Sequence, residues 1–168
     1  MTQMKYMRGD FFFRLISVLF LSFLMLSCNG KSKEEQLIDD LPISVQVERF
    51  DKAFALAEVS DLDELKRRYP LFFPTQYPDS VWRAKIVDTL QNELDHEVGV
   101  VFEDDAVLNE SISDLFRHIS YYTPGFEVPN VVTTTSDVDY RTRVIANRRW
   151  LIIMLDTYLG SEHKFYEG

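Results

Sequence analysis

The sequence contains one cysteine, Cys28, among 168 residues. An intramolecular disulfide and a zinc site built from several cysteines are therefore excluded. The six glycines are scattered along the chain and form no glycine-rich phosphate loop. The sequence also has neither a serine-nucleophile elbow nor a cysteine–histidine pair. No residue pattern requires an enzyme, so we expect no catalytic residue and no cofactor.

Histidine is also scarce, with three residues in the chain. The stretch "HEVGV" begins at His96 like a helical zinc motif, but that motif needs a second histidine where Val100 stands. We interpret His96 as a solvated helix residue between two acidic neighbours. His118 falls in an amphipathic segment and His163 in the final residues, so the histidines indicate no metal site.

The chain has no apolar run long enough to span a bilayer as a helix, which takes about 20 residues. The run "LISVLFLSFLML" at residues 15–26 is shorter and falls within the usual length of a signal-peptide core. It is flanked by the basic residues Lys5, Arg8 and Arg14, and by the small residue Ser27. We therefore predict that residues 1–27 form a secretory signal peptide.

Cys28 stands directly after this small residue, in the stretch "MLSC". The stretch resembles a bacterial lipobox, in which the thiol receives a diacylglycerol before the signal peptide is removed, although Leu26 is bulkier than the commonest residue there. The alternative is a buried or incidental thiol after an ordinary signal peptide. We predict that Cys28 is lipidated, with palmitate among its acyl chains, and that it anchors the protein to a membrane of the cell envelope. The leaflet stays open.

The remaining residues divide into a polar stretch at 28–41, which we interpret as a flexible tether, and a single domain at 42–168. Without residues 1–27 the basic residues fall from 18 to 15 and the acidic ones from 27 to 26, so the net charge is about −11. This acidity argues against a nucleic-acid partner and against a polybasic membrane patch. We therefore expect the domain to be held at the membrane by the lipid on Cys28 alone.

The pattern of apolar residues predicts helices and strands in one domain. Residues 43–50 alternate as a half-buried strand, and Asp51 and Asp61 stand where two short helices would be capped. The aromatic loop "YPLFFPTQYPDS" at 69–80 is expected to pack into the core, with an exposed ligand-binding surface as the alternative.

Two longer helices are predicted at 80–102 and 106–122. In the first, an inward stripe recurs every fourth residue, at Trp82, Ile86, Leu90, Leu94 and Val98. The opposite, solvated face of that helix is assigned Arg83, Lys85, Asp88, Gln91 and Asp95. In the second helix the inward residues are Leu108, Ile112, Leu115, Phe116 and Ile119.

The period changes after residue 125. The stretches at 128–136 and 143–156 are rich in Val, Ile and Thr and predict strands, with a turn at Asn147-Arg148. "WLIIML" at 150–155 is apolar throughout, as in a central strand that is covered on both faces. The fold class is therefore α+β (mixed α/β), with amphipathic helices packed on a small mixed sheet. Because few residues follow this strand to supply its neighbours, we expect the domain to be incomplete at its C-terminus.

Three aspartates near the predicted strands form the candidate functional site. Asp137 and Asp139 alternate in "SDVDYR", so in an extended segment both carboxylates would point the same way and would suit a cation. The alternative is a turn in which they accept backbone hydrogen bonds or pair with Arg141 or Arg143. Asp156 follows the most apolar strand, where α/β proteins often place functional groups, and its alternative role is to cap the next turn.

Four stretches resemble one family when they are taken together and in order: "VQVERFD", "YPLFFPTQYPDSVW", "SDVDYRTRVI" and "LDTYLGSEHKFYEG". They resemble the gliding-motility-associated lipoprotein family GldB of Bacteroidota, and the resemblance covers residues 28–168. That family is longer and continues past the last residue here, so the resemblance implies an N-terminal portion. It adds Tyr140, Tyr158, His163 and Tyr166 as motif residues of unknown role.

The resemblance implies an accessory or structural envelope lipoprotein that supports gliding motility and the associated secretion machinery, with protein partners in that apparatus. The alternative is the remnant of a metal-dependent hydrolase-like domain in which Asp137, Asp139 and Asp156 lie near a cation. The family is distantly similar to zinc-peptidase-like proteins, whose HExxH helix has no match in this sequence. We therefore transfer no catalytic residue.

Overall fold

The structure is a computed structural model that describes residues 31–166, in two units that divide between Asp40 and Leu41. Cys28 and the predicted signal peptide lie outside the described residues. In the first unit, the segment predicted to be a tether contains helix α2 (Lys33–Asp39). The Oγ of Ser32 accepts a hydrogen bond from the Glu35 backbone, and the Glu35 carboxylate accepts one from the Ser32 backbone. This reciprocal capping explains why so polar a stretch begins a helix here.

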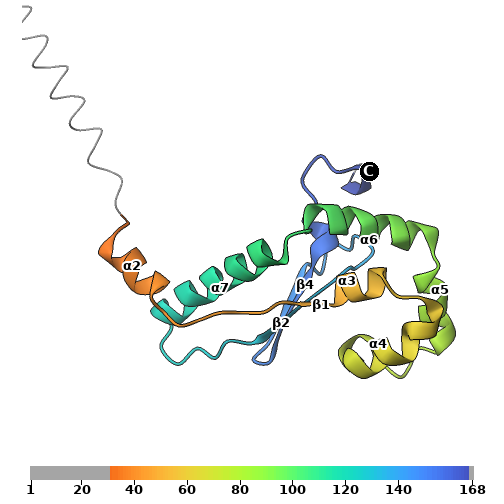
Figure 1. Cartoon of the computed structure of the whole chain (residues 1–168), viewed down its shortest axis with the longest axis horizontal. Helices are drawn as coiled ribbons and strands as arrows, with labels where there is room; N and C mark the ends of the chain where they lie inside the picture. Colours follow the sequence, from red (N-terminus) through yellow and green to blue (C-terminus); the bar gives the residue numbers. More distant parts are fainter. Residues whose placement is uncertain (1–30, 167–168) are drawn as a thin grey trace, which may run out of the picture. The chain divides into compact units, whose positions relative to one another are not determined.

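The second unit places a four-stranded sheet among five α-helices (Figure 1). The strands are β1 (Glu48–Arg49), β2 (Asn130–Thr134), β3 (Val144–Ala146) and β4 (Trp150–Met154). The helices are α3 (Phe50–Ala55), α4 (Leu62–Arg68), α5 (Asp79–Ile86), α6 (Thr89–Val101) and α7 (Asp105–Tyr122). These elements confirm the predicted α+β class.

The sheet order is β1-β2-β4-β3, in which β1, β2 and β4 are parallel and β3 runs antiparallel to β4. Strand β4 is therefore central, as its apolar composition predicts. The expectation that it lacks neighbours is wrong, because the preceding hairpin supplies β3 on one side and the earlier strand β2 lies on the other.

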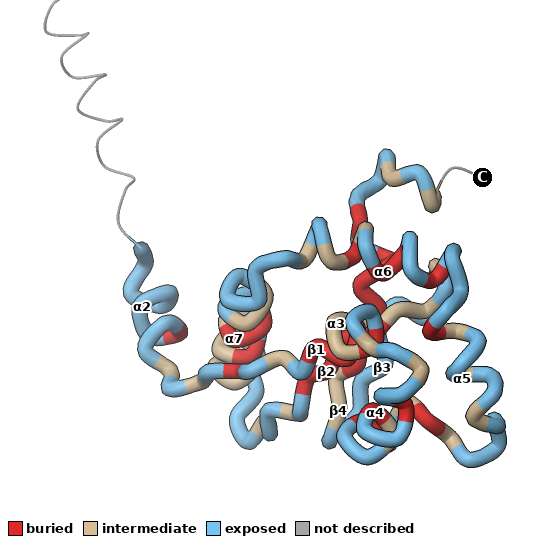
Figure 2. The backbone as a smooth tube through the Cα atoms, turned by 45° about the vertical axis from the view of Figure 1, so that its right-hand side comes forward, coloured by how far each residue is buried: buried red, intermediate tan, exposed pale blue. Residues whose placement is uncertain are grey.

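The two faces of the sheet are covered by different helices. On one face, Val131 of β2 packs with Ile112 and Phe116 of α7. On the other face, Val132 and Ile152 pack with an aromatic cluster from α3 and the segment that follows α4. Buried residues accordingly concentrate along the strands and along the inner sides of α6 and α7 (Figure 2).

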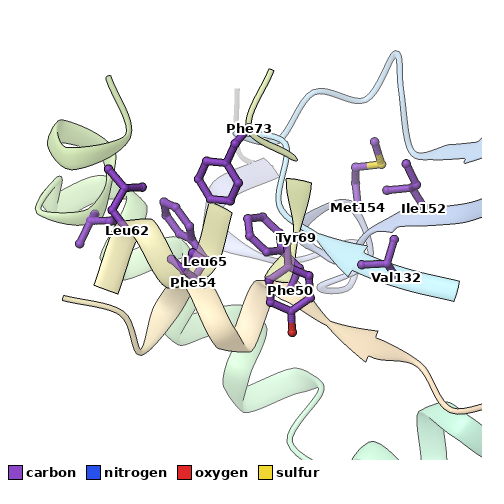
Figure 3. Packing of buried hydrophobic residues seen from close by; sticks show 10 residues of the cluster. Phe50, Phe54, Leu62, Leu65, Tyr69, Phe73, Val132, Ile152 and Met154 are labelled. Carbon is purple, nitrogen blue, oxygen red and sulfur yellow. The ribbon is translucent and has the colours of Figure 1, made fainter. Parts of the chain in front are cut away.

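The aromatic loop belongs to this core. Phe72 stacks on Phe50 with ring centroids 4.1 Å apart, and Phe73 meets the Trp82 ring edge-on at 5.0 Å. Tyr69 is buried in the same cluster (Figure 3), whereas Tyr77 is half exposed. The packing interpretation of this loop is confirmed, because most of its rings contact protein rather than solvent.

The predicted strand at 43–50 is shorter than expected, since only Glu48–Arg49 pairs in the sheet as β1. The backbone N–H of Val45 donates to Ser113 Oγ at 2.8 Å, and that of Val47 donates to Asn109 Oδ1 at 2.9 Å. Side chains of α7 thus accept the backbone hydrogen bonds that a neighbouring strand would otherwise accept. The alternating pattern correctly predicted burial but not a β-ladder.

The predicted helix at 80–102 is two helices, α5 and α6, separated at Val87 and Asp88. Asp88 caps α6 by accepting a hydrogen bond from the Gln91 backbone at 2.8 Å. The break changes which face is turned inward. Gln91 and Asp95 are buried and Leu90 is 64 % exposed, so their predicted placement is wrong.

Helix α7 lies where the sequence predicted a helix. Ile112 and Phe116 are buried as expected. Leu115, which was also assigned to the inner face, is 45 % exposed because it lies at the margin of the apolar stripe.

Candidate functional site at the carboxyl end of the sheet

The parallel strands β1, β2 and β4 end at the same edge of the sheet, and the residues that follow them meet there. Asp51 follows β1, Ser136 follows β2, and Asp156 follows β4. Helix α6 lies across this edge, where Leu94 and Val98 pack against Leu155. The carboxyl edge of a parallel sheet is a common position for functional groups.

Asp156 is fully buried, and its carboxylate organises the loop after β2. Its Oδ2 accepts hydrogen bonds from the backbone N–H groups of Val138 at 2.7 Å and Ser136 at 3.0 Å, and the Ser136 hydroxyl lies 3.2 Å away. The Asp156 backbone carbonyl accepts a further bond from the Tyr166 hydroxyl at 2.7 Å. Asp156 therefore joins the end of β4 to the 136–139 loop.

The 136–139 loop is not the extended segment that the sequence suggested. Asp137 and Val138 have φ angles of 56° and 59°, in the left-handed region. Such a conformation is unfavourable for a β-branched residue by about 1–2 kcal/mol. The bond from Val138 to Asp156 holds this strained backbone in place, so the two aspartates of the loop do not alternate along one face.

The two loop aspartates accordingly bind separate cationic side chains. Asp137 pairs with Lys85 of α5 at 3.0 Å. Asp139 accepts two hydrogen bonds from the Arg141 guanidinium, at 2.8 and 2.9 Å, and these bonds lower the pKa of Asp139. Within residues 31–166, no three His, Cys, Asp or Glu side chains gather in a group that would hold a metal ion.

A buried ion pair lies at the end of β1. The Arg49 guanidinium donates to Asp51 at 2.6 Å, and the Thr133 hydroxyl donates to the same carboxylate. Arg49 also reaches the Phe102 carbonyl at 2.9 Å and Asp105 at 2.5 Å, which links β1 to the start of α7. The prediction that Asp51 caps a helix is wrong, because this carboxylate binds Arg49 and Thr133 instead.

Asp95 is the least satisfied charged group at this edge. Its Oδ1 accepts a hydrogen bond from Gln91 Nε2 at 2.7 Å, and the same amide donates to the Thr135 hydroxyl at 3.1 Å. Its Oδ2 is buried and has no hydrogen-bond partner among the described residues. Burial away from water raises the pKa of Asp95 to about 6.

A cleft of about 340 Å³ opens beside these groups, between α5, α6 and the strained loop. Lys85, Gln91, Val138 and Phe165 contribute to its lining. The arrangement contains no nucleophile held by a base, and its buried acids are engaged mainly by protein donors.

Comparison with protein families places this chain in a known family. The family model described as gliding motility protein GldB matches residues 31–168, which include every element of the sheet and the polar groups at its edge. The chain belongs to the GldB family. Neither the search of curated proteins nor that of solved structures gave a match.

Membership of the GldB family relates the chain to gliding motility, in agreement with the resemblance noted from its motifs. The label of the family model also marks its members as lipoproteins. None of the helices within residues 31–166 combines the length and the apolar composition that a bilayer-spanning helix needs.

GldB motif residues from the loop after β2 and from the tail lie near the same edge. Tyr140 and Tyr166 meet edge-on with ring centroids 5.4 Å apart, and His163 lies 3.3 Å from Glu97 of α6. Tyr158 is exposed. Sequence reasoning found these residues and Asp156, but it missed Gln91 and Asp95. Their spacing with Leu94 and Val98 matches one helical face, a signal that the choice of a strict four-residue repeat obscured.

Proposed function

We propose that this chain is a lipid-anchored protein of the cell envelope that supports gliding motility as an accessory component without catalysis. The family membership carries the motility part of the proposal. The sequence around Cys28 supports the anchor, because the cysteine follows a signal-peptide pattern and stands three residues before the matched region.

Lipidation of Cys28 would supply a firm attachment. Each buried methylene contributes about 0.8 kcal/mol, so a single short acyl chain binds marginally and two or more hold stably. The acidic composition of the chain favours attachment by lipid over attachment by a basic surface. The anchor would place the described domain next to protein partners of the gliding and secretion apparatus.

An accessory role is favoured because the polar groups of the candidate site bind one another. Asp137 and Asp139 pair with Lys85 and Arg141, and Asp156 accepts backbone hydrogen bonds. The alternative of a metal-dependent hydrolase-like domain gains no support from these contacts, since each carboxylate already has a protein partner.

The test is a Cys28→Ala substitution in the gene of a gliding host, with Ser22→Ala as the matched control in the apolar run. We expect the Cys28 variant to lose incorporation of radiolabelled palmitate, to leave the membrane fraction, and to reduce colony spreading and secretion. The Ser22 variant should behave as wild type. Equal labelling of both variants would refute the anchor, whereas normal spreading after deletion of the gene would refute the motility role.

A further inference from the structure

The hairpin formed by β3 and its turn differs from the rest of the domain in exposure. All nine residues from Arg141 to Arg149 are exposed. Val144 and Ile145 are apolar β-branched residues, and they are 44 % and 42 % exposed. Strand β3 also forms one edge of the sheet. An exposed apolar edge strand is a template for pairing with another chain.

The backbone of β3 has one free side. The backbone carbonyl of Arg143 accepts a hydrogen bond from the backbone N–H of Met154 at 3.0 Å, and the backbone N–H of Asn147 donates to the carbonyl of Trp150 at 2.9 Å. Between them, Ile145 is paired with Ile152. In an antiparallel ladder, alternate residues turn their N–H and C=O groups to the other side. Val144 and Ala146 therefore direct their backbone donors and acceptors away from β4, and no further strand pairs with β3 within residues 31–166.

The charge around this edge is opposite to that of the chain. The hairpin carries Arg141, Arg143, Arg148 and Arg149, and no acidic residue occurs between Tyr140 and Leu155, in a chain of net charge −9. Arg141 pairs with Asp139, and Arg143 lies over the Tyr140 ring. Within the described residues, the side chains of Arg148 and Arg149 enter no ion pair. The edge thus presents unneutralised positive charge.

A cleft continues from the end of the strand. It measures about 580 Å³, and Phe126, Glu127, Ala146 and Arg148 contribute to its lining. A segment that pairs with the outer side of β3 would pass Ala146 and bring one of its side chains to this cleft. The Phe126 ring offers that side chain an apolar contact.

We infer that the outer edge of β3 binds an extended, acidic segment of a partner protein, which adds a strand to the sheet. Free backbone groups explain why the segment is extended, and the arginines explain why it is acidic. A second copy of this chain is disfavoured, because two arginine-rich hairpins would face each other. A membrane surface is disfavoured because Val144 and Ile145 point to opposite faces, and unpaired peptide groups are unfavourable in lipid.

The inference concerns the partner's chemistry and does not depend on the lipidation of Cys28. The test begins with full-length protein in phosphatidylcholine nanodiscs and a random peptide display library. We expect the selected peptides to alternate Asp or Glu with Val, Ile or Thr and to lack proline. Selection of basic peptides, or of none, would overturn the inference whatever the outcome at Cys28.

Two substitutions locate the binding edge. Arg148→Glu with Arg149→Glu should weaken the selected peptide by about tenfold, because each exposed ion pair lost contributes modestly. The matched control is Arg67→Glu with Arg83→Glu, which reverses two exposed arginines on α4 and α5 and should leave the affinity unchanged. An equal loss in both double variants would show general charge attraction and would refute a site at β3.

N-methylation of the peptide tests strand pairing directly. Methyl groups on alternate residues whose N–H groups face β3 should abolish binding, and those on the intervening residues should be tolerated. Loss at every position, or at none, would exclude strand addition. Nanodiscs that contain phosphatidylglycerol separate the lipid alternative, because unchanged peptide affinity supports a protein partner, and displacement of the peptide by the anionic lipid contradicts it.

Discussion

Asp95 makes the stability of this domain depend on pH in a defined direction. The carboxyl group is buried, and its Oδ2 has no hydrogen-bond partner among the described residues. The folded state binds the proton more tightly than the unfolded state, since the pKa rises from 3.8 to about 6. The stabilising contribution is therefore complete below pH 3.8 and is lost as the pH rises through 6.

The substitution Asp95→Asn removes this dependence. A rise from 3.8 to about 6 corresponds to about 3 kcal/mol of unfolding free energy, at roughly 1.4 kcal/mol per pKa unit. The asparagine keeps an oxygen for the bond from Gln91, but its buried amide without an acceptor offsets about 1–2 kcal/mol. We expect the variant to be about 1–2 kcal/mol more stable than wild type at pH 8.

Urea unfolding followed by the fluorescence of Trp82 and Trp150 measures this difference. The stability advantage of Asp95→Asn over wild type should be smaller at pH 4 than at pH 8 by more than about 2 kcal/mol. At pH 4 wild-type Asp95 is almost fully protonated in the folded state but less than half protonated in the unfolded state, so most of its stabilising contribution is present. Asp63→Asn on the exposed side of α4 is the control and should change stability by less than about 0.5 kcal/mol. A difference that stays constant from pH 4 to pH 8 would refute the reasoning.

Two further substitutions test the same edge of the sheet. Arg49→Ala should destabilise the domain by about 3–5 kcal/mol in urea unfolding because it leaves Asp51 buried without its cation, and adding Asp51→Ala should recover part of that loss. A double variant as unstable as the sum of the two single variants would show that the pair is not coupled. Val138→Gly should be nearly neutral or stabilising, because relief of the left-handed conformation offsets lost packing. Val131→Gly in β2 should cost about 3 kcal/mol, and a similar loss at both valines would argue against strain at Val138.

The contacts of the candidate site indicate how the domain presents its surfaces. Asp156 and the Arg49–Asp51 pair fix the ends of the parallel strands, and α6 closes over them. The lateral edge strand β3 is left with backbone groups that no other strand pairs with among residues 31–166.

The sequence by itself determined the α+β class, the helix predicted at 106–122, the central position of β4 and the packing of the aromatic loop. Each of these depends on a local property, because the apolar period selects helix or strand and bulky rings are driven out of water wherever they fall. The ordered motifs also identified the family, which needs no tertiary contact. Cys28 remains a prediction from the sequence alone.

Only the tertiary structure decided which groups meet. The donors of Val45 and Val47 find side chains of α7, and the break at Asp88 turns Gln91 and Asp95 toward the sheet. Asp156 stabilises a left-handed backbone at Val138 that no local preference of valine predicts. The type of a residue and the pattern around it indicate whether it prefers burial or needs hydrogen bonds. The partner that satisfies it comes from segments far away in the sequence, so its identity emerges only when the chain has folded.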